Sequence, residues 1–75
     1  MKLFLVSSNE MIKFLESRGF CVHHSKGSHF VLVKPGLARL VVPFRKELPI
    51  GTTLAILREA GIPREDYVGF FSGKR

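Results

Sequence analysis

The sequence contains a single cysteine, Cys21. One thiol cannot form an internal disulfide, and one thiol with three clustered histidines lacks the ligand spacing of a zinc site. Because Cys21 lies in an apolar stretch, we expect a buried and inert thiol rather than a nucleophile, which would need an exposed, electropositive setting. The sequence therefore predicts neither a metal site nor a cofactor.

Long hydrophobic runs are also missing. No apolar segment approaches the ~18 residues of a transmembrane helix, and the opening MKLFLV is too short for the core of a signal peptide. Neither predicted helix combines a strongly apolar face with a Lys/Arg-rich face, as a membrane-surface helix would. We therefore expect a cytoplasmic protein with no membrane partner.

Acidic residues are few. Six Asp and Glu stand against 12 Lys and Arg, which gives a net charge of +6 on 75 residues. Such an excess favours a polyanionic partner, either nucleic acid or an acidic protein, although solubility alone could also explain it. The length fits one small domain, residues 1–75, with a thin core and a shallow site on a sheet or loop.

The first half of the chain predicts one helix followed by a β-meander. A capping box in Ser7–Glu10 and a glycine stop at Gly19 place the helix at about residues 8–18. Residues 3–6 are expected to form a short strand or a leading arm. Three antiparallel strands should follow, with the turn signal Pro35-Gly36 before the last one, over residues 20–25, 29–34 and 37–43.

The second half predicts two more helices. One begins after Pro49 and ends at Gly61, and Pro63 opens a short last helix that is held by its aromatic residues. The predicted fold class is α+β, in the order α-β-β-β-α with a short extra C-terminal helix. Both main helices should cover one face of the three-stranded antiparallel sheet and leave the other face free for a ligand.

All three histidines lie in the stretch HHSKGSH, residues 23–29. If His24 and His29 are opposed across a hairpin with a four-residue loop, they share the solvent-exposed end of one sheet face. Directly opposed side chains have Cβ atoms roughly 4.5–5.5 Å apart. A one-residue slip in register would break this arrangement. The same face would then hold Phe20, Val22, Val31 and Val33.

This placement suits acid–base chemistry at an anion site. Free imidazole exchanges protons near neutral pH, so it can act as a general base. Lys26 and the backbone amides around Gly27 and Ser28 could hold an anion beside it, because glycine permits close approach. A solvated histidine pair without a task is the alternative. Four further basic residues could extend the positive surface: Lys34, Arg39, Arg45 and Lys46.

Several of these segments together resemble the HicA family, the small toxins of HicA–HicB toxin–antitoxin pairs. The resemblance covers roughly residues 7–71. Its most specific parts are Gly27-Ser28-His29 and the segment KEL…GT…ILREAG, and their order and spacing matter more than either motif alone. The segments that carry it are ESRGF at the end of the first helix, KGSHF at 26–30, VVP at 41–43 and KELPIGTTLAILREAGI at 46–62.

The resemblance implies both a fold and an activity. The family has a fold similar to double-stranded-RNA-binding domains and acts as a ribonuclease on messenger RNA. Its activity depends on the histidine of the GSH motif, which is His29 here, and a HicB partner binds the toxin and masks that histidine. His29 would then be the base that activates the RNA 2′-hydroxyl, with Lys26 and the Gly27–Ser28 amides beside the phosphate.

The sequence departs from the family pattern after VVP, where many members carry another histidine and this chain has Phe44-Arg45-Lys46. Arginine stays protonated, so Arg45 can hold a phosphate but cannot shuttle protons. His24 or water could supply the leaving-group proton, and His23 is expected to take no part. A non-catalytic RNA-binding module on the same fold is the alternative function, because charge alone could bind RNA.

Overall fold

The computed structural model describes residues 4–37 and 39–72. The elements are α1 (Ser8–Ser17), β1 (Cys21–Lys26), β2 (His29–Val33), β3 (Leu40–Pro43), α2 (Ile50–Ala60) and α3 (Arg64–Ser72). The predicted element order, including the extra C-terminal helix, is therefore confirmed. Residues 4–7 form an arm without regular secondary structure, whereas Leu3 of the expected strand lies outside the described residues.

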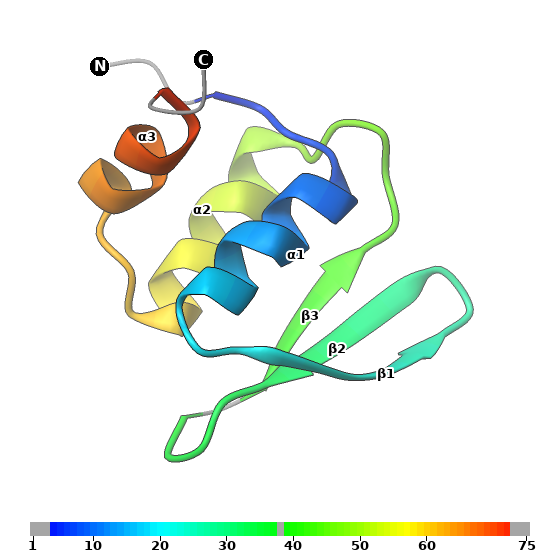
Figure 1. Cartoon of the computed structure of the whole chain (residues 1–75). Helices are drawn as coiled ribbons and strands as arrows, with labels where there is room; N and C mark the ends of the chain where they lie inside the picture. The colour runs from blue at the N-terminus through cyan, green and yellow to red at the C-terminus, as the bar shows by residue number, and fades with distance from the viewer. Residues whose placement is uncertain (1–3, 38, 73–75) are drawn as a thin grey trace.

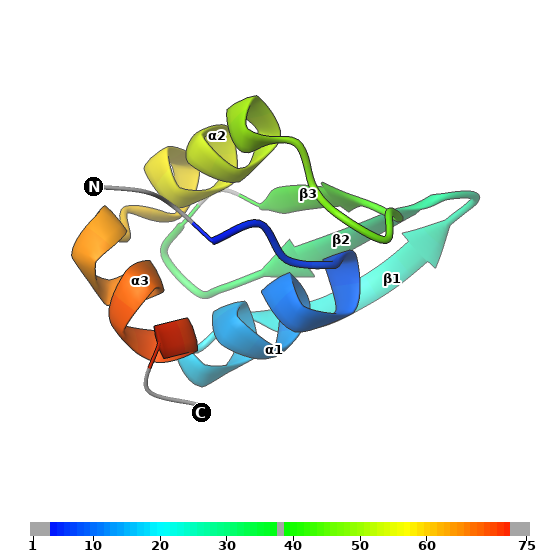
Figure 2. The same ribbon diagram turned by 90° about the horizontal axis from the view of Figure 1, so that it is seen from above.

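The three strands form one antiparallel sheet in the order β1-β2-β3. All three helices lie on one side of this sheet (Figure 1). Seen from above, α1 lies over the β1 side and α2 over the β3 side (Figure 2). In the described part of the chain, the opposite face of the sheet carries no helix, as the sequence predicts.

The start of α1 follows from its cap. The Ser7 side chain accepts a hydrogen bond from the Glu10 amide, and the Glu10 carboxylate accepts one from the Ser7 amide. This reciprocal pair satisfies two of the amides that a helix start leaves without partners. The helix ends at Ser17, one residue earlier than predicted, before Gly19 with φ +96°.

The third strand is shorter than predicted. Leu37 was expected in it, but its amide donates to the Lys34 carbonyl at 3.0 Å and closes a turn over Pro35-Gly36. Gly36 has φ +83°, the conformation that the third position of a type II turn requires. The strand therefore begins only at Leu40, and Ala38 lies outside the described residues.

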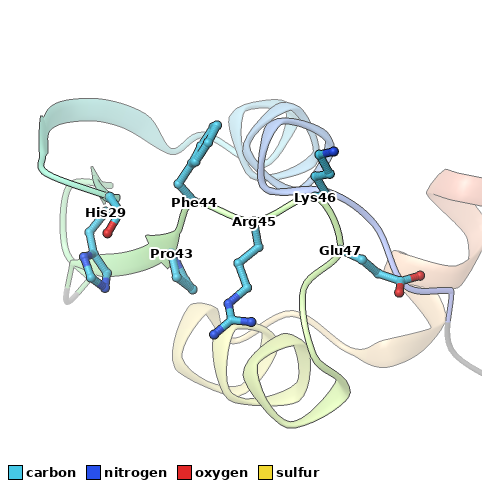
Figure 3. Close-up of a pocket in the computed structure, with 7 residues that line it drawn as sticks. His29, Pro43, Phe44, Arg45, Lys46 and Glu47 are labelled. Atoms are coloured by element: carbon cyan, nitrogen blue, oxygen red, sulfur yellow. The ribbon is translucent and has the colours of Figure 1, made fainter.

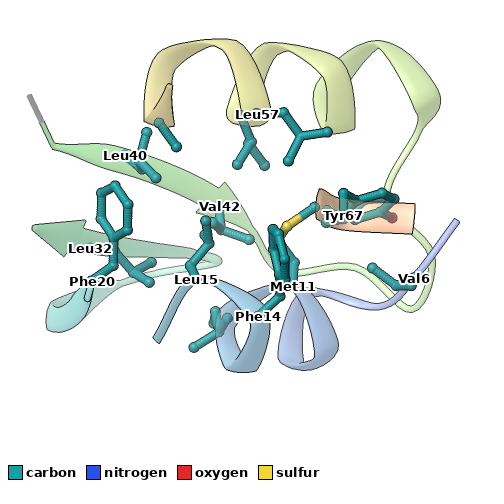
Figure 4. Close-up of a cluster of buried hydrophobic side chains, with 14 residues drawn as sticks. Val6, Met11, Phe14, Leu15, Phe20, Leu32, Leu40, Val42, Leu57 and Tyr67 are labelled. Atoms are coloured by element: carbon teal, nitrogen blue, oxygen red, sulfur yellow. The ribbon is translucent and has the colours of Figure 1, made fainter. Parts of the chain in front are cut away.

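The core lies between the helices and the inner face of the sheet (Figure 4). Leu32 and Val42 contribute from the sheet, Phe14 from α1 and Leu57 from α2, and each is at most 2% exposed. A buried apolar layer of this kind is the main stabilising contribution in a domain of this size. It fixes the strands that carry the histidine hairpin.

Cys21 is exposed, so the prediction of a buried thiol was wrong. Its neighbour Phe20 is buried, but Cys21 begins the edge strand β1, in which all six residues are exposed. Cys21 pairs with Val33, and Val33 follows the inward-facing Leu32. Because strand side chains alternate, this pairing places Cys21 on the face away from the helices.

Candidate functional site

The histidine hairpin closes more tightly than the sequence predicts. Lys26 pairs with His29, which leaves a two-residue loop of Gly27 and Ser28. The predicted register, with His24 opposite His29 and a four-residue loop, was therefore wrong. Gly27 has φ +59° and is the first loop residue, as in the type II′ turns whose twist matches paired strands. A two-residue turn leaves fewer backbone N–H and C=O groups without partners than a four-residue loop.

A β-bulge accounts for the rest of the register error. The pairing shifts between Val22 and His24, so that His23 is the extra residue in β1. A bulge bends the strand and lets two consecutive side chains approach each other. The Nδ1 atoms of His23 and His24 lie 2.7 Å apart in a hydrogen bond. His23, for which the sequence predicts no role, is thus the direct neighbour of His24.

The actual pairing still brings His24, Lys26 and His29 to one face. Lys26 is opposite His29, and His24 is opposite Val31, two residues further along each strand. Side chains of paired residues point to the same face. This is the outer face, because Leu32, next to Val31, points into the core. His24 and His29 are diagonal neighbours, for which Cβ separations of roughly 7–8 Å are typical.

His29 lies on the wall of an open pocket of about 560 Å³ (Figure 3). The pocket is formed where the Gly27–Ser28 loop meets the segment that follows β3. It contains three of the residues that the sequence singled out for phosphate contact. Its lining residues are Ser28, His29, Pro43, Phe44, Arg45, Lys46 and Glu47.

The side chains that line this pocket extend in two opposite directions. His29, Pro43 and Arg45 extend to one side of the chain that follows β3, whereas Phe44 and Lys46 extend to the other (Figure 3). His29 also pairs with Pro43 across the sheet, so Arg45, two residues later, continues on the same side. Both His29 and Arg45 are exposed. An imidazole and a guanidinium can therefore reach one solvent-borne ligand from neighbouring positions.

The backbone around Arg45 is fixed by the start of α1. The Ser8 amide donates to the Arg45 carbonyl at 3.0 Å, and the Arg45 amide donates to Ser8 Oγ at 3.3 Å. Ser8 itself is only 1% exposed. The Phe44 amide donates to the Ser28 carbonyl at 2.6 Å and so joins this segment to the hairpin loop. The two halves of the pocket are thus connected by hydrogen bonds.

Lys34 and Arg39 are not brought to this pocket. Lys34 follows the far end of β2, five residues and about 16 Å of strand from His29. Its Nζ lies 5.6 Å from the centre of the Phe20 ring, a cation–π distance. Arg39 is exposed and precedes Leu40, which pairs with Leu32 at the same far end.

Three lining residues were not assigned a role from the sequence. These residues, Pro43, Phe44 and Glu47, lie next to the predicted Arg45 and Lys46 in the sequence. Their position beside these two cations is the one sequence feature that could have predicted that they line the pocket. Phe44 is 59% exposed, with its ring centre 6.0 Å from that of Phe30.

No three His, Cys, Asp or Glu side chains within residues 4–37 and 39–72 are grouped so that they could hold a metal ion. No helix in the same part of the chain has the length and hydropathy needed to cross a membrane.

The sequence matches the model of a known protein family. The family model described as HicA toxin of bacterial toxin-antitoxin matches residues 8–62 of the 75-residue chain. No curated protein matches the sequence. The matched region runs from the start of α1 through the hairpin and the pocket to the end of α2. The arm and α3 lie outside it.

Proposed function

Because the chain belongs to the HicA family of toxins from toxin–antitoxin systems, we propose that it is an endoribonuclease that cleaves messenger RNA without a metal ion. The observation that carries this proposal is the common side of the pocket that His29 and Arg45 share. A base and a fixed cation at one open site are what cleavage next to a 2′-hydroxyl requires. The ribose hydroxyl supplies the nucleophile, so no bound metal has to generate one.

In this mechanism His29 takes the proton of the 2′-hydroxyl. The 2′-oxygen then attacks the adjacent phosphorus, and the bond from phosphorus to the 5′-oxygen breaks. One product ends in a 2′,3′-cyclic phosphate, and the other begins with a 5′-hydroxyl after its oxygen gains a proton. Acid–base assistance of this kind typically supplies about 10²–10⁴-fold in rate.

Charge stabilisation falls to the cations around His29. The Arg45 guanidinium can donate two parallel hydrogen bonds to phosphoryl oxygens. Lys26, paired with His29 across the hairpin, adds a second positive charge. The amides of the Gly27–Ser28 turn are oriented donors that need no reorganisation during the reaction. Lys46 supports the neighbouring phosphates, and Lys34 and Arg39 would meet RNA only beyond the pocket.

The proton for the leaving 5′-oxygen comes from His24 or from water. Arg45 cannot provide it, because a guanidinium does not deprotonate in proteins. His24 lies on the same face as His29, and its Nδ1 contacts His23. Its Nε2 is then the atom left to donate. If both histidines act, kcat/KM should show a bell-shaped pH profile.

The protein partner we propose is a HicB-like antitoxin that covers the basic catalytic face in the cytoplasm. With a net charge of +6, the chain favours an acidic partner, which would compete with RNA for the same cations. Covering the pocket would block His29 without any change in its geometry.

Expression of the wild type and of His29→Ala in cells tests the catalytic assignment. Growth arrest with loss of transcripts is expected only for the wild type, and purified protein should release 2′,3′-cyclic phosphate ends in the presence of EDTA. Arg64→Ala, at an exposed position of α3 outside the pocket, is the control and should remain toxic. Equal toxicity of wild type and His29→Ala would instead identify a non-catalytic RNA-binding module.

A further inference from the structure

We propose that the arm, residues 4–7, and α3 form a clasp that positions the pocket loop, residues 44–48, through the hydroxyl of Tyr67. Both parts of this clasp lie outside the family match. The inference rests on the function proposed above, because the pocket loop carries Arg45 and Lys46. Tyr67 would be a positioning residue, since it lines no part of the pocket.

The pocket loop has no helix or strand of its own. Its start is held by Ser8, through the two hydrogen bonds to Arg45 described above. Its end is held by the arm, because the Leu48 amide donates to the Val6 carbonyl at 2.8 Å. Leu48 and Val6 are both buried, so this bond is shielded from water. The position of the arm therefore sets the position of the loop's second anchor.

The arm is held in turn by α3. The Tyr67 hydroxyl donates a hydrogen bond to the Phe4 carbonyl, two residues before Val6. Figure 1 shows the arm starting beside α3, and Figure 4 shows Tyr67 at the same end of the core as Val6. Phe4 is 37% exposed, so its side chain is only partly buried at this end of the arm. The Tyr67 hydroxyl adds a directional hydrogen bond to its backbone.

Tyr67 is itself firmly fixed. It is fully buried, and its ring packs edge-on against Phe14 at 5.6 Å and against Phe71 at 5.1 Å between ring centres. Burial, with the nearby Glu10 carboxylate, raises the pKa of Tyr67 to about 12. The hydroxyl therefore remains a hydrogen-bond donor throughout the neutral range. Arg18, the residue after α1, and Asp66 of α3 add an ion pair at 3.3 Å.

Amide hydrogen exchange tests the clasp without any RNA. Tyr67→Phe keeps the ring but frees the Phe4 carbonyl, so exchange at the Leu48 amide should accelerate by roughly fivefold or more. The Leu32 amide in the central strand reports global unfolding, so its exchange accelerates with any loss of stability. Phe71→Leu is the matched control, since it loosens ring packing and keeps the hydroxyl. It should accelerate exchange at Leu32 and leave exchange at Leu48 nearly unchanged. Acceleration at Leu48 that is the same in Phe71→Leu as in Tyr67→Phe overturns the proposal.

Binding of a short 2′-O-methyl RNA, which cannot be cleaved, tests the link to the pocket. Tyr67→Phe should weaken binding severalfold in the wild type and cause a clearly smaller loss in Arg45→Ala, in which Lys46 is the remaining cation of the loop. Equal losses in both backgrounds would mean that Tyr67 does not act through Arg45, and they would overturn the link. If the wild type binds no RNA, the proposed function fails, whereas the exchange experiment still decides whether the clasp exists.

Discussion

At the scale of the residue, Arg45 is a pocket cation whose backbone is fixed by hydrogen bonds. Its backbone is held on both sides by Ser8, and its side chain extends to the side of His29. A planar guanidinium matches two phosphoryl oxygens, whereas lysine offers a single point charge. In the proposed mechanism Arg45 therefore binds two phosphoryl oxygens beside His29. Its charge and exposure alone would not predict this role.

We predict that Arg45→Ala lowers kcat/KM for RNA cleavage by roughly tenfold or more, which corresponds to about 1.4 kcal/mol. Arg45→Lys should fall between the wild type and Arg45→Ala, because it keeps the charge and loses the paired donors. Steady-state cleavage of a fluorescent RNA gives the comparison. Arg64→Ala removes an exposed arginine from α3 and controls for net charge. Equal losses in both alanine variants would contradict a specific phosphate contact.

Gly27 supports the pocket through its backbone. An added Cβ would meet no atom within 4 Å, but φ is +59°. We therefore predict that Gly27→Ala destabilises the fold by about 1–2 kcal/mol, from backbone strain and not from a clash. Thermal melting should show a decrease of several degrees. Gly51→Ala, at an equally open helical position without positive φ, should instead be neutral or stabilising. A Gly27→Ala variant as stable as the wild type would contradict this account.

At the scale of the element, the sequence predicts what depends on local patterns. The capping box of Ser7 and Glu10 gives the start of α1 to the residue, and Gly61 in the left-handed conformation marks the end of α2. These signals are local, because the groups that satisfy each other lie within one helical turn. The element order follows from them.

The same sequence does not reveal how the strands of the first hairpin pair. The sequence predicts an unbroken strand through His23 and His24, and nothing in it marks His23 as the extra residue of a bulge. One extra residue reverses which side chains face outward, so Val22 and Val31 do not share a face as predicted. Cys21 was misjudged for a related reason, since burial in β1 depends on the helix cover above it. The proximity of Arg45 to His29 likewise depends on the sheet, because 15 residues lie between them in the sequence.

The attachment of α3 predicts a specific response to alkaline pH. Burial raises the pKa of Tyr67 from 10.0 to about 12, so the unfolded chain releases this proton at lower pH than the folded chain. The protonated Tyr67 hydroxyl contributes fully to the free energy of unfolding below pH 10. As the pH rises from 10 to 12, the free energy of unfolding falls on the order of 2 kcal/mol. Urea unfolding of wild type and Tyr67→Phe should show their stability difference shrinking over this range. Lysines titrate in both proteins and cancel in the difference, so a constant difference would contradict the prediction.

At the scale of the whole molecule, the cations around the sheet divide between its two ends. Lys26, Arg45 and Lys46 lie at the pocket end, and Lys34 and Arg39 lie at the far end of the strands. Val31 and Val41 pair across the middle of the outer face. A short single strand of RNA held at His29 would therefore meet one group of cations, whereas a long duplex could contact both.

This division predicts how binding depends on salt. Each phosphate contact to single-stranded nucleic acid contributes a slope of about −0.7 in log K against log salt, so three cations at the pocket end give roughly −2. A 2′-O-methyl RNA of a few nucleotides should show this slope in the wild type. Arg45→Ala should make it less steep by about 0.7, while Arg39→Ala should leave it unchanged. If Arg39→Ala reduces the slope as much as Arg45→Ala, RNA spans the whole face. Tighter binding of a long duplex with a steeper slope would then favour the double-stranded-RNA-binding module over the pocket-centred enzyme.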